Sequence, residues 1–248
     1  MSKCLIVTGG GRGIGAEVSR KAAKQGYSVC VNFHRDQTSA QKLVRELEKE
    51  GANALAYQAD VSREEEVEAL FQTVEKDLGT PEALVNNAGI LDLQTRVDGM
   101  NAERIQRIFA VNVTGSFLCA REAVKRMSTK YGGKGGSIVN LSSGAAKYGS
   151  PGEYVDYAAS KAAIDTLTIG LAKEVAEEGI RVNAVRPGFI DTEIHQSGGE
   201  PDRMERVRPL VPMKRVGQAE EVADAIMWLL SDKASNTTGT ILDVSGGR

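Results

Sequence analysis

The chain has 248 residues, a length at which α/β chains commonly form one domain, so we expect a single domain over 1–248. Its 27 glycines and 6 prolines are too few for a disordered or collagen-like chain. The formal net charge is −2, and positive and negative residues are interspersed, so the chain has no long basic stretch that would attract a nucleic-acid backbone. We therefore expect no nucleic-acid partner. The apolar run before Thr8 is too short for a signal peptide or a membrane span, so we expect a cytoplasmic protein without a membrane partner.

The cysteines and histidines argue against a metal site. Cys4, Cys30 and Cys119 lie in apolar stretches without the paired spacing of a disulfide framework or a zinc site, so we expect buried, reduced thiols. The two histidines, His34 and His195, are too few for a multi-histidine metal centre and give little support to a histidine-based triad. We expect each to be an exposed loop residue.

Apolar, β-rich runs alternate with helix-periodic segments along the whole chain. The predicted strands are 4–7, 27–33, 54–57, 83–85, 137–141, 181–185 and 240–244. The predicted helices are 14–25, 39–50, 63–77, 102–130, 156–178 and 219–231, and glycines stand where four of them should stop. This alternation is typical of a doubly wound α/β fold, with a parallel sheet covered by helices on both faces.

One segment departs from this rhythm. The segment 188–212 contains two adjacent glycines and three prolines, and it is longer than an ordinary loop between a strand and a helix. Loops of this length in compact domains are commonly lids or binding loops, so we expect a substrate lid here. Glu193 and His195 are then candidates for substrate contact, although a solvated loop position is the more common role for each of them.

A glycine-rich turn joins the first predicted strand to the first predicted helix, from Thr8 to Gly15 (TGGGRGIG). Glycine allows positive φ angles and close approach of the backbone to a pyrophosphate, and the helix N-terminus supplies free N–H groups. The turn therefore predicts a phosphate cradle. Glycine turns are also often only structural, and the turn alone leaves that alternative open.

Tyr157 and Lys161 are four residues apart on a predicted helix and hence share one face. A tyrosine with its ordinary pKa of about 10 is a poor acid or base at neutral pH, but a neighbouring cation favours the phenolate and lowers that pKa. The pair therefore predicts an acid/base group that could protonate a carbonyl or deprotonate an alcohol.

Polar side chains follow the carboxyl ends of two predicted strands. Parallel α/β sheets bind their ligands at this edge. Ser142 and Ser143 follow one strand, and either could polarise a substrate oxygen or simply cap the turn. The run from Asn86 to Gly89 ends another strand, and its amides could contact a cofactor or fix the strand ends. The residues alone leave these alternatives open.

Taken together, the motifs resemble those of the short-chain dehydrogenase/reductase family, in its single-domain branch. The resemblance rests on the glycine turn, the Asn86–Gly89 run, Ser143, the Tyr157/Lys161 pair and Pro187 with Gly188. It implies a nicotinamide cofactor and a seven-stranded Rossmann sheet of order 3-2-1-4-5-6-7. It also implies a catalytic tetrad, formed here by Asn112, Ser143, Tyr157 and Lys161.

In that family the serine and tyrosine hydrogen-bond the substrate oxygen, the lysine also holds the nicotinamide ribose, and the asparagine holds a proton-relay water. The resemblance places the cofactor on Gly9, Arg12, Gly13, Ile14, Gly15, Arg35, Asp60, Val61, Asn87, Ala88, Gly89, Tyr157, Lys161, Pro187, Gly188, Ile190 and Thr192. By family analogy we also expect a homotetramer.

The residues near the second predicted strand favour NADP over NAD. NAD-selective members of the family carry an acid at the end of this strand, where this chain has Phe33. Arg12 and Arg35 could instead pair with a 2′-phosphate, because guanidinium groups match phosphate geometry. Asp36 is nearby but is expected to cap the following helix.

The leading hypothesis is therefore an NADP-dependent oxidoreductase that interconverts a ketone or aldehyde with a secondary alcohol or sugar hydroxyl. The nearest resemblances are glucose 1-dehydrogenase-like and 3-oxoacyl-acyl-carrier-protein reductase-like enzymes of bacteria. An acyl carrier protein is acidic and should dock on a basic surface. A basic cluster favours such a partner: Lys125, Arg126, Lys130 and Lys134. An acidic helix end argues against it: Glu174, Glu177 and Glu178. A catalytically silent nucleotide-binding or redox-sensing protein is the alternative of another class.

Overall fold

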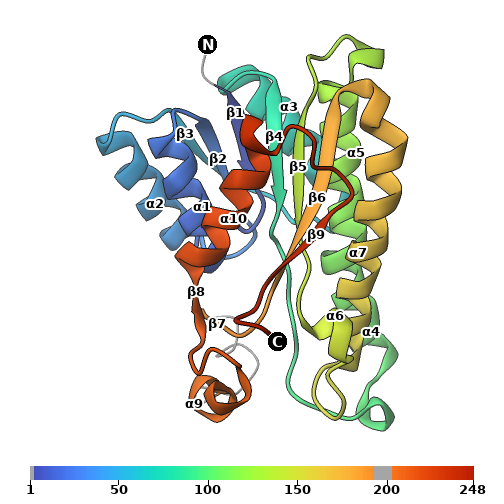
Figure 1. Ribbon diagram of the computed structural model, residues 1–248. Coiled ribbons are helices and arrows are strands. Elements are labelled where there is room, and N and C mark those ends of the chain that lie inside the picture. Colours follow the sequence, from blue (N-terminus) through green and yellow to red (C-terminus); the bar gives the residue numbers. More distant parts are fainter. Residues whose placement is uncertain (1–2, 193–202) are drawn as a thin grey trace.

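The computed structural model describes residues 3–192 and 203–248, and its central element is a parallel β-sheet (Figure 1). Seven strands build this sheet: β1 (Cys4–Val7), β2 (Ser28–Phe33), β3 (Ala54–Gln58), β4 (Pro81–Asn86), β5 (Gly136–Leu141), β6 (Ile180–Pro187) and β9 (Ile241–Val244). Their order is β3-β2-β1-β4-β5-β6-β9, and every neighbouring pair is parallel. The sheet and the predicted strand order are thereby confirmed.

The seventh sheet strand is numbered β9 because a separate small sheet lies between it and β6 in the sequence. β7 (Ile190–Asp191) pairs in parallel with β8 (Gly217–Gln218). This pairing brings together the two sides of the predicted lid, although 27 sequence positions separate Ile190 from its partner Gly217.

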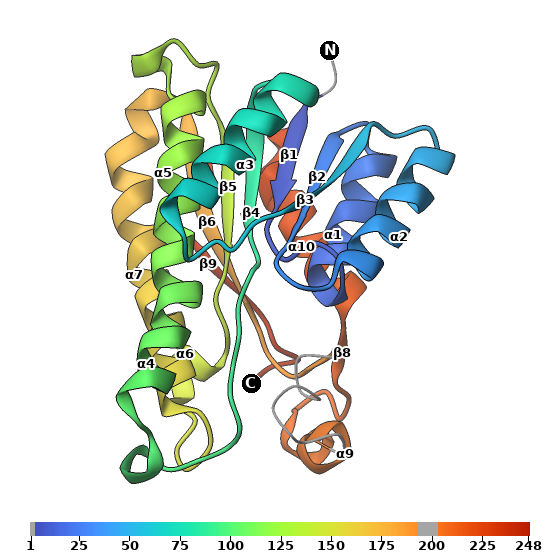
Figure 2. The ribbon, with the colours of Figure 1, turned by 180° about the vertical axis from the view of Figure 1, so that it is seen from behind.

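Helices cover both faces of the sheet, as the ribbon shows from opposite sides (Figures 1 and 2). One face carries α1 (Gly13–Lys24), α2 (Gln37–Lys49) and α10 (Ala219–Leu230), and the other carries α3 (Glu64–Asp77), α5 (Gly115–Met127) and α7 (Val155–Val175). Each strand feeds both layers because successive side chains point to opposite faces. In β1, Leu5 and Val7 belong to the first apolar core and Ile6 to the second.

The helix predicted over 102–130 is present from Ala102 to Met127, but it is not α-helical throughout. The structure has α4 (Ala102–Phe109), a π-helical turn (Ala110–Thr114) and then α5. Two contacts account for the wider turn. Asn112 turns its side chain to the backbone of Ile90, and Gly115 packs so closely on Val61 that a Cβ there would lie 2.7 Å from Val61 Cγ2. Turns of this kind occur often at functional sites.

The helix predicted over 156–178 also ends early. α7 stops at Val175 and a 3₁₀ turn (Ala176–Glu178) follows, with Gly179 at φ +77°. The remaining short elements are α6 (Ala145–Tyr148), α9 (Arg203–Val207) and 3₁₀ turns at Val97–Gly99, Thr129–Tyr131, Arg208–Leu210 and Asp232–Ala234. α9 lies beyond the carboxyl ends of the sheet strands, close to the C-terminus (Figures 1 and 2).

The described part of segment 188–212 is therefore structured by β7, α9 and the turn Arg208–Leu210. Glu193 and His195, the candidates for substrate contact, lie outside the described residues. The three cysteines are free and buried, as expected, and burial raises the pKa of Cys4 and of Cys119 to about 12. Within residues 3–192 and 203–248, none of the helices is both long and apolar enough to cross a membrane.

Candidate active site

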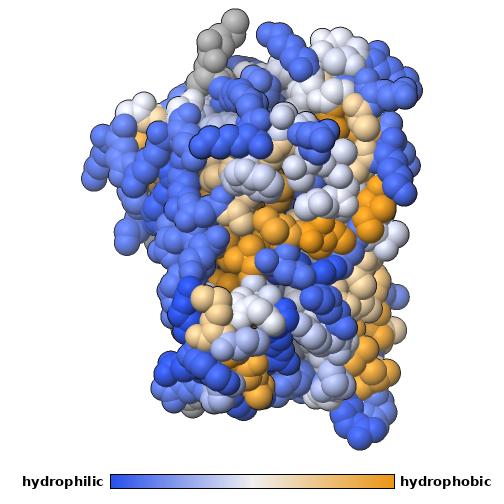
Figure 3. Space-filling view, in the orientation of Figure 1, coloured by the Kyte–Doolittle hydropathy of each residue, from blue (hydrophilic) through white to orange (hydrophobic). Residues whose placement is uncertain are grey.

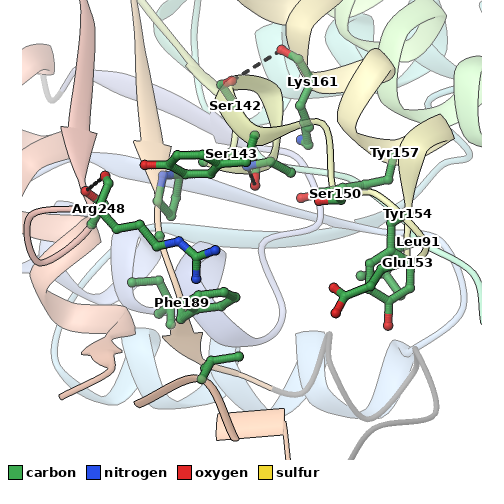
Figure 4. Close-up of a pocket in the computed structure, with 18 of the residues that line it drawn as sticks. Leu91, Ser142, Ser143, Ser150, Glu153, Tyr154, Tyr157, Lys161, Phe189 and Arg248 are labelled. Carbon is green, nitrogen blue, oxygen red and sulfur yellow. Dashed lines mark hydrogen bonds between the residues drawn. The ribbon is translucent and has the colours of Figure 1, made fainter. Parts of the chain in front are cut away.

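A cavity of about 360 Å³ opens at the carboxyl ends of β4, β5 and β6 (Figure 4). Three of the four predicted catalytic residues line it: Ser143, Tyr157 and Lys161. Of the residues predicted to hold the cofactor, Ile14, Asn87, Gly89, Tyr157, Lys161, Pro187, Gly188, Ile190 and Thr192 line it as well. The other eight lie outside this lining: Gly9, Arg12, Gly13, Gly15, Arg35, Asp60, Val61 and Ala88.

Lys161 is buried on α7, with 4% of its surface exposed. Its Nζ donates a hydrogen bond to the Leu141 carbonyl at the end of β5 over 2.6 Å and lies 5.7 Å from the centroid of the Tyr157 ring. Burial lowers the pKa of Lys161 to about 8, against an opposing effect of the Asp165 carboxylate. The one-face geometry predicted for the pair is thus present.

The pKa of Tyr157 moves in the direction opposite to the expected one. Burial raises it, and this effect outweighs the hydrogen bond from Ser143 and the charge of Arg203, which both lower it. Lys161 is not among the groups that shift the pKa of Tyr157; its Nζ lies 5.7 Å from the ring centroid and donates to the Leu141 carbonyl. At neutral pH the ligand-free phenol is therefore protonated, which suits a proton donor.

The two serines after β5 have different surroundings. Ser142 is buried and donates to the Lys161 carbonyl over 3.2 Å, so it joins β5 to α7 (Figure 4). Ser143 faces the cavity, accepts from the Ala145 N–H over 3.1 Å at the start of α6, and is hydrogen-bonded to Tyr157. Ser143 therefore both caps the turn and reaches the tyrosine.

Asn112 is fully buried in the π-helical turn and does not line the cavity. Its Oδ1 accepts from the Ile90 N–H over 2.8 Å, and its Nδ2 donates to the Ile90 carbonyl over 2.9 Å and to Ser160 Oγ over 3.0 Å. A Cβ placed on Gly89 would lie 3.4 Å from Lys161 Nζ and 3.5 Å from Asn112 Oδ1. Asn112 thus positions the chain after β4 and stands next to the lysine across Gly89.

The glycine turn is held from two strands. Asn87, after β4, donates its side-chain amide to the carbonyls of Thr8 (2.9 Å) and Gly9 (3.0 Å). Asn32, in β2, accepts from the Gly9 N–H at Oδ1 (3.3 Å) and from the Gly10 N–H at its carbonyl (2.9 Å). The sequence left the role of Asn87 open and gave no sign of Asn32. Both fix the shape of the turn.

This turn fits a bound phosphate. Gly9 and Gly13 have φ angles of +59° and +52°, which favour glycine. A Cβ on Gly15 would lie 2.6 Å from Asn87 Nδ2, so only glycine allows α1 to approach this closely. The first turn of α1 contains no acidic residue, and its N–H groups have no intrahelical acceptors. Anion binding at this helix end therefore meets no competing carboxylate.

The end of β2 has the charge distribution that the sequence suggested. Phe33 is buried there, whereas Arg12 and Arg35 are exposed beside it. Asp36 caps α2, as expected: its Oδ1 accepts from the Ser39 N–H over 3.0 Å. That hydrogen bond, together with the nearby Arg12 charge, lowers the pKa of Asp36. Arg12 thus lies close enough to Asp36 for its charge to act on that carboxylate.

Asp60 and Val61 follow β3. Asp60 Oδ1 accepts from the backbone and the side chain of Ser62, over 2.9 and 2.7 Å, and its Oδ2 lies 3.6 Å from Nε2 of the half-exposed His34. Val61 is buried against Gly115. Asp60 thus shapes the loop after β3.

The wall opposite the catalytic groups was not predicted from the sequence. It contains Phe189 and Arg248, whereas Tyr154 lies on the same side of the cavity as Tyr157 (Figure 4). Tyr148 and Arg203 also line the cavity. Arg203, only 7% exposed, forms an ion pair with Glu153 over 2.7 Å and lies 5.0 Å from the Tyr154 ring centroid. These residues come from separate short segments, and no sequence pattern relates them.

A protein-family model described as Enoyl-(Acyl carrier protein) reductase matches residues 9–248 of the chain. The chain is 57% identical to the uncharacterized oxidoreductase YgfF of Escherichia coli (strain K12), over 98% of each chain. It is 37% identical to glucose 1-dehydrogenase 2 of Bacillus subtilis (99% of this chain, 94% of the relative) and 35% identical to the 3-oxoacyl-[acyl-carrier-protein] reductase FabG of Staphylococcus aureus (100% and 98%).

These similarities span the whole sheet and all the motifs of the cavity. They agree with a parallel sheet of Rossmann order and with a tyrosine, a serine and a lysine gathered at its carboxyl edge. The chain belongs to the short-chain dehydrogenase/reductase family and is an oxidoreductase that acts on CH–OH and C=O groups.

Proposed function

We propose that this protein is an NADP-dependent oxidoreductase that interconverts a ketone or aldehyde with a secondary alcohol or sugar hydroxyl, with Tyr157 as general acid and base. The observation that carries the proposal is the convergence of the Ser143 hydroxyl and the Tyr157 phenol in one cavity, with the Lys161 ammonium beside the tyrosine ring. A proton donor and a second hydroxyl can then hold a single substrate oxygen.

In the reductive direction, the protonated Tyr157 donates its hydroxyl proton to the carbonyl oxygen, which also accepts a hydrogen bond from Ser143. The reverse path removes the proton from the alcohol. The tyrosinate that forms regains its proton from solvent. Lys161, whose Nζ donates to the Leu141 carbonyl and lies 5.7 Å from the Tyr157 ring centroid, would hold the nicotinamide ribose. The nicotinamide, when bound, supplies or takes up the hydride.

The glycine turn and the N-terminus of α1 would hold the cofactor pyrophosphate, for the reasons of backbone shape and charge given above. The family uses a nicotinamide cofactor, NAD or NADP. The preference for NADP rests on three residues at the end of β2: Phe33 in place of an acid, and the exposed Arg12 and Arg35.

The alternative of a carrier-protein substrate is weakened by the ion pairs around α5. Glu122 accepts from Lys125 (2.8 Å) and Arg126 (2.8 Å), and Arg126 also pairs with Glu75 (3.1 Å). Half of the basic cluster is thereby neutralised inside the chain. A surface that attracts an acidic carrier protein needs uncompensated positive charge. We therefore favour a small-molecule substrate.

We also propose a homotetramer in the cytoplasm. Phe117 on α5 and Ile169 on α7 are 49% and 40% exposed, and Figure 3 shows apolar residues along the edge where Figure 1 places α7. Gly170, in the interior of α7, would place a Cβ in open space. A mid-helix glycine costs up to about 1 kcal/mol, and a close approach of a second copy of this helix would explain it.

Tyr157→Phe tests the catalytic assignment, with Tyr131→Phe at an exposed position outside the cavity as the control. A panel of ketones, aldehydes, polyols and sugars is screened by cofactor absorbance. For any substrate found, we expect Tyr157→Phe to lower kcat by about 10²- to 10⁴-fold. NADPH affinity, measured by fluorescence, should change little. A kcat near that of the wild type would exclude Tyr157 as the proton donor.

A further inference from the structure

The segment 245–248 folds back over the cavity and places an arginine in its wall. Gly246 and Gly247 have φ angles of +64° and +93°, a conformation that other residues rarely adopt. The Gly246 carbonyl accepts from the Met213 N–H over 3.1 Å, and Ser245 Oγ donates to the Arg248 carbonyl over 2.6 Å. The reversal is thus fixed at both ends, and Arg248 is directed toward the cavity (Figure 4).

The Arg248 guanidinium lies between two aromatic rings. Its Cζ is 4.6 Å from the centroid of Phe189 and 5.1 Å from that of Tyr148, contacts that orient a planar cation. Its Nη1 is buried and has no hydrogen-bond acceptor among the described residues. A buried donor without an acceptor is costly, and a charged one more so. The site therefore lacks an acceptor that a ligand could supply.

The other charges of the cavity do not satisfy this cation. Among the described residues of its lining, four are basic (Lys161, Arg203, Arg206 and Arg248) and only Glu153 is acidic. Both carboxylate oxygens of Glu153 are engaged, by Arg203 (2.7 Å) and Arg206 (3.2 Å). Glu153 is therefore not the partner of Arg248, which stands on the side of the cavity opposite Tyr157 (Figure 4).

We infer that Arg248 binds a carboxylate of the substrate, so that the enzyme acts on a keto acid or hydroxy acid with an apolar body. A carboxylate matches the two-donor edge of a guanidinium and completes the missing hydrogen bond. The aromatic rings of Tyr154 and Phe189 would pack on the apolar part, while the reacting C=O or C–OH lies at Tyr157. This inference rests on the proposed function, because it places the reacting oxygen at that tyrosine.

The first test compares a ketone acid with its uncharged ester: 4-oxocyclohexanecarboxylate and its methyl ester, each with NADPH. We expect the wild type to favour the acid in kcat/KM by about tenfold or more, as one charge-assisted hydrogen bond implies. Arg248→Gln should abolish this ratio. Arg45→Gln, which removes an exposed arginine outside the cavity, should keep it. Equal use of acid and ester by the wild type would overturn the inference.

The second test needs no turnover. Calorimetry measures binding of cyclohexanecarboxylate, which has no reducible group, to the full chain without cofactor. We expect Arg248→Gln to weaken this binding at least about tenfold, and NADPH affinity, followed by fluorescence, to stay equal in both proteins. Unchanged carboxylate binding would refute the anion site. Carboxylate binding that depends on Arg248, without reduction of either ketone, would instead refute the proposed function and leave the anion site standing.

Discussion

Replacing the buried lysine by an isosteric apolar residue should remove activity without destabilising the fold. In Lys161→Met the apolar side chain keeps the packing of α7 against β5, and the charge is lost. Two effects on stability oppose each other. The burial of the ammonium no longer costs free energy, but the Leu141 carbonyl loses the donor that now lies 2.6 Å away.

The pKa of Lys161 gives the size of the first effect. Burial lowers it from 10.5 to about 8, and since each pH unit of such a change is worth 1.36 kcal/mol, burial of the charged lysine destabilises the fold by about 3 kcal/mol at neutral pH. An unsatisfied carbonyl costs about 1–3 kcal/mol. At pH 7 we therefore expect the variant to be as stable as the wild type, or more stable by up to about 2 kcal/mol.

The pH dependence is the sharper signature. Between pH 8 and 10.5 the unfolded chain holds the Lys161 proton while the folded chain has released it, so the wild type gains stability as the pH rises through this window. From pH 7 to pH 9, the free energy of unfolding of the wild type should rise by about 1 kcal/mol relative to that of Lys161→Met. Other titrating groups are common to both proteins and cancel in the difference.

Urea unfolding at pH 7 and pH 9 measures this difference, with Lys173→Met, an exposed position on the same helix, as the control. The control should show no such pH-dependent change relative to the wild type. A Lys161→Met protein that is destabilised by more than about 2 kcal/mol at pH 7, with no change at pH 9, would show that the ammonium stabilises the fold. The reasoning from burial would then be wrong.

Three further predictions concern the cofactor, the assembly and the lid. Arg35→Ala should weaken NADP binding about tenfold and NAD binding little, whereas Arg45→Ala should affect neither; tighter binding of NAD by the wild type would contradict the 2′-phosphate assignment. Gly170→Trp should convert a tetramer into smaller species in light scattering, and a monomeric wild type at micromolar concentration would refute the assembly. Backbone amides of 188–192 and 203–212 should exchange hydrogen quickly without ligands and slowly with cofactor and substrate; strong protection without ligands would show a structural segment instead.

The sheet and its helices were predictable because their signals are local and repeated. Strands buried on both faces read as apolar runs, and glycines mark the helix ends. The boundaries at the π-helical turn were not predictable. The amide of Asn112 binds the backbone of Ile90, 22 positions earlier, and Gly115 is close to Val61 only in the folded chain. Helix periodicity does not record such contacts.

The prediction that Lys161 lowers the pKa of Tyr157 was wrong for a related reason. The spacing of Tyr157 and Lys161 shows that they share a helix face, but the effect of the cation depends on where its Nζ points. In the structure Nζ donates to the Leu141 carbonyl, a group of another element, and burial controls both pKa values. The sequence thus predicts which groups meet, and the folded environment decides the protonation state in which they meet.

The two sides of the cavity differ in how they are fixed, and this explains why the reaction is easier to infer than the substrate. The groups proposed for proton transfer stand on a sheet edge and a long helix, joined by hydrogen bonds such as those of Lys161 to β5 and of Asn87 to the glycine turn. The opposite wall comes from short segments, with Phe189 after β6 and Arg248 in the final turn. Changes in these segments leave the sheet edge intact, so the substrate can differ among proteins that share one chemistry. The identity of the substrate therefore has to be sought in the charge of that wall, where Arg248 Nη1 is a buried donor without an acceptor among the described residues.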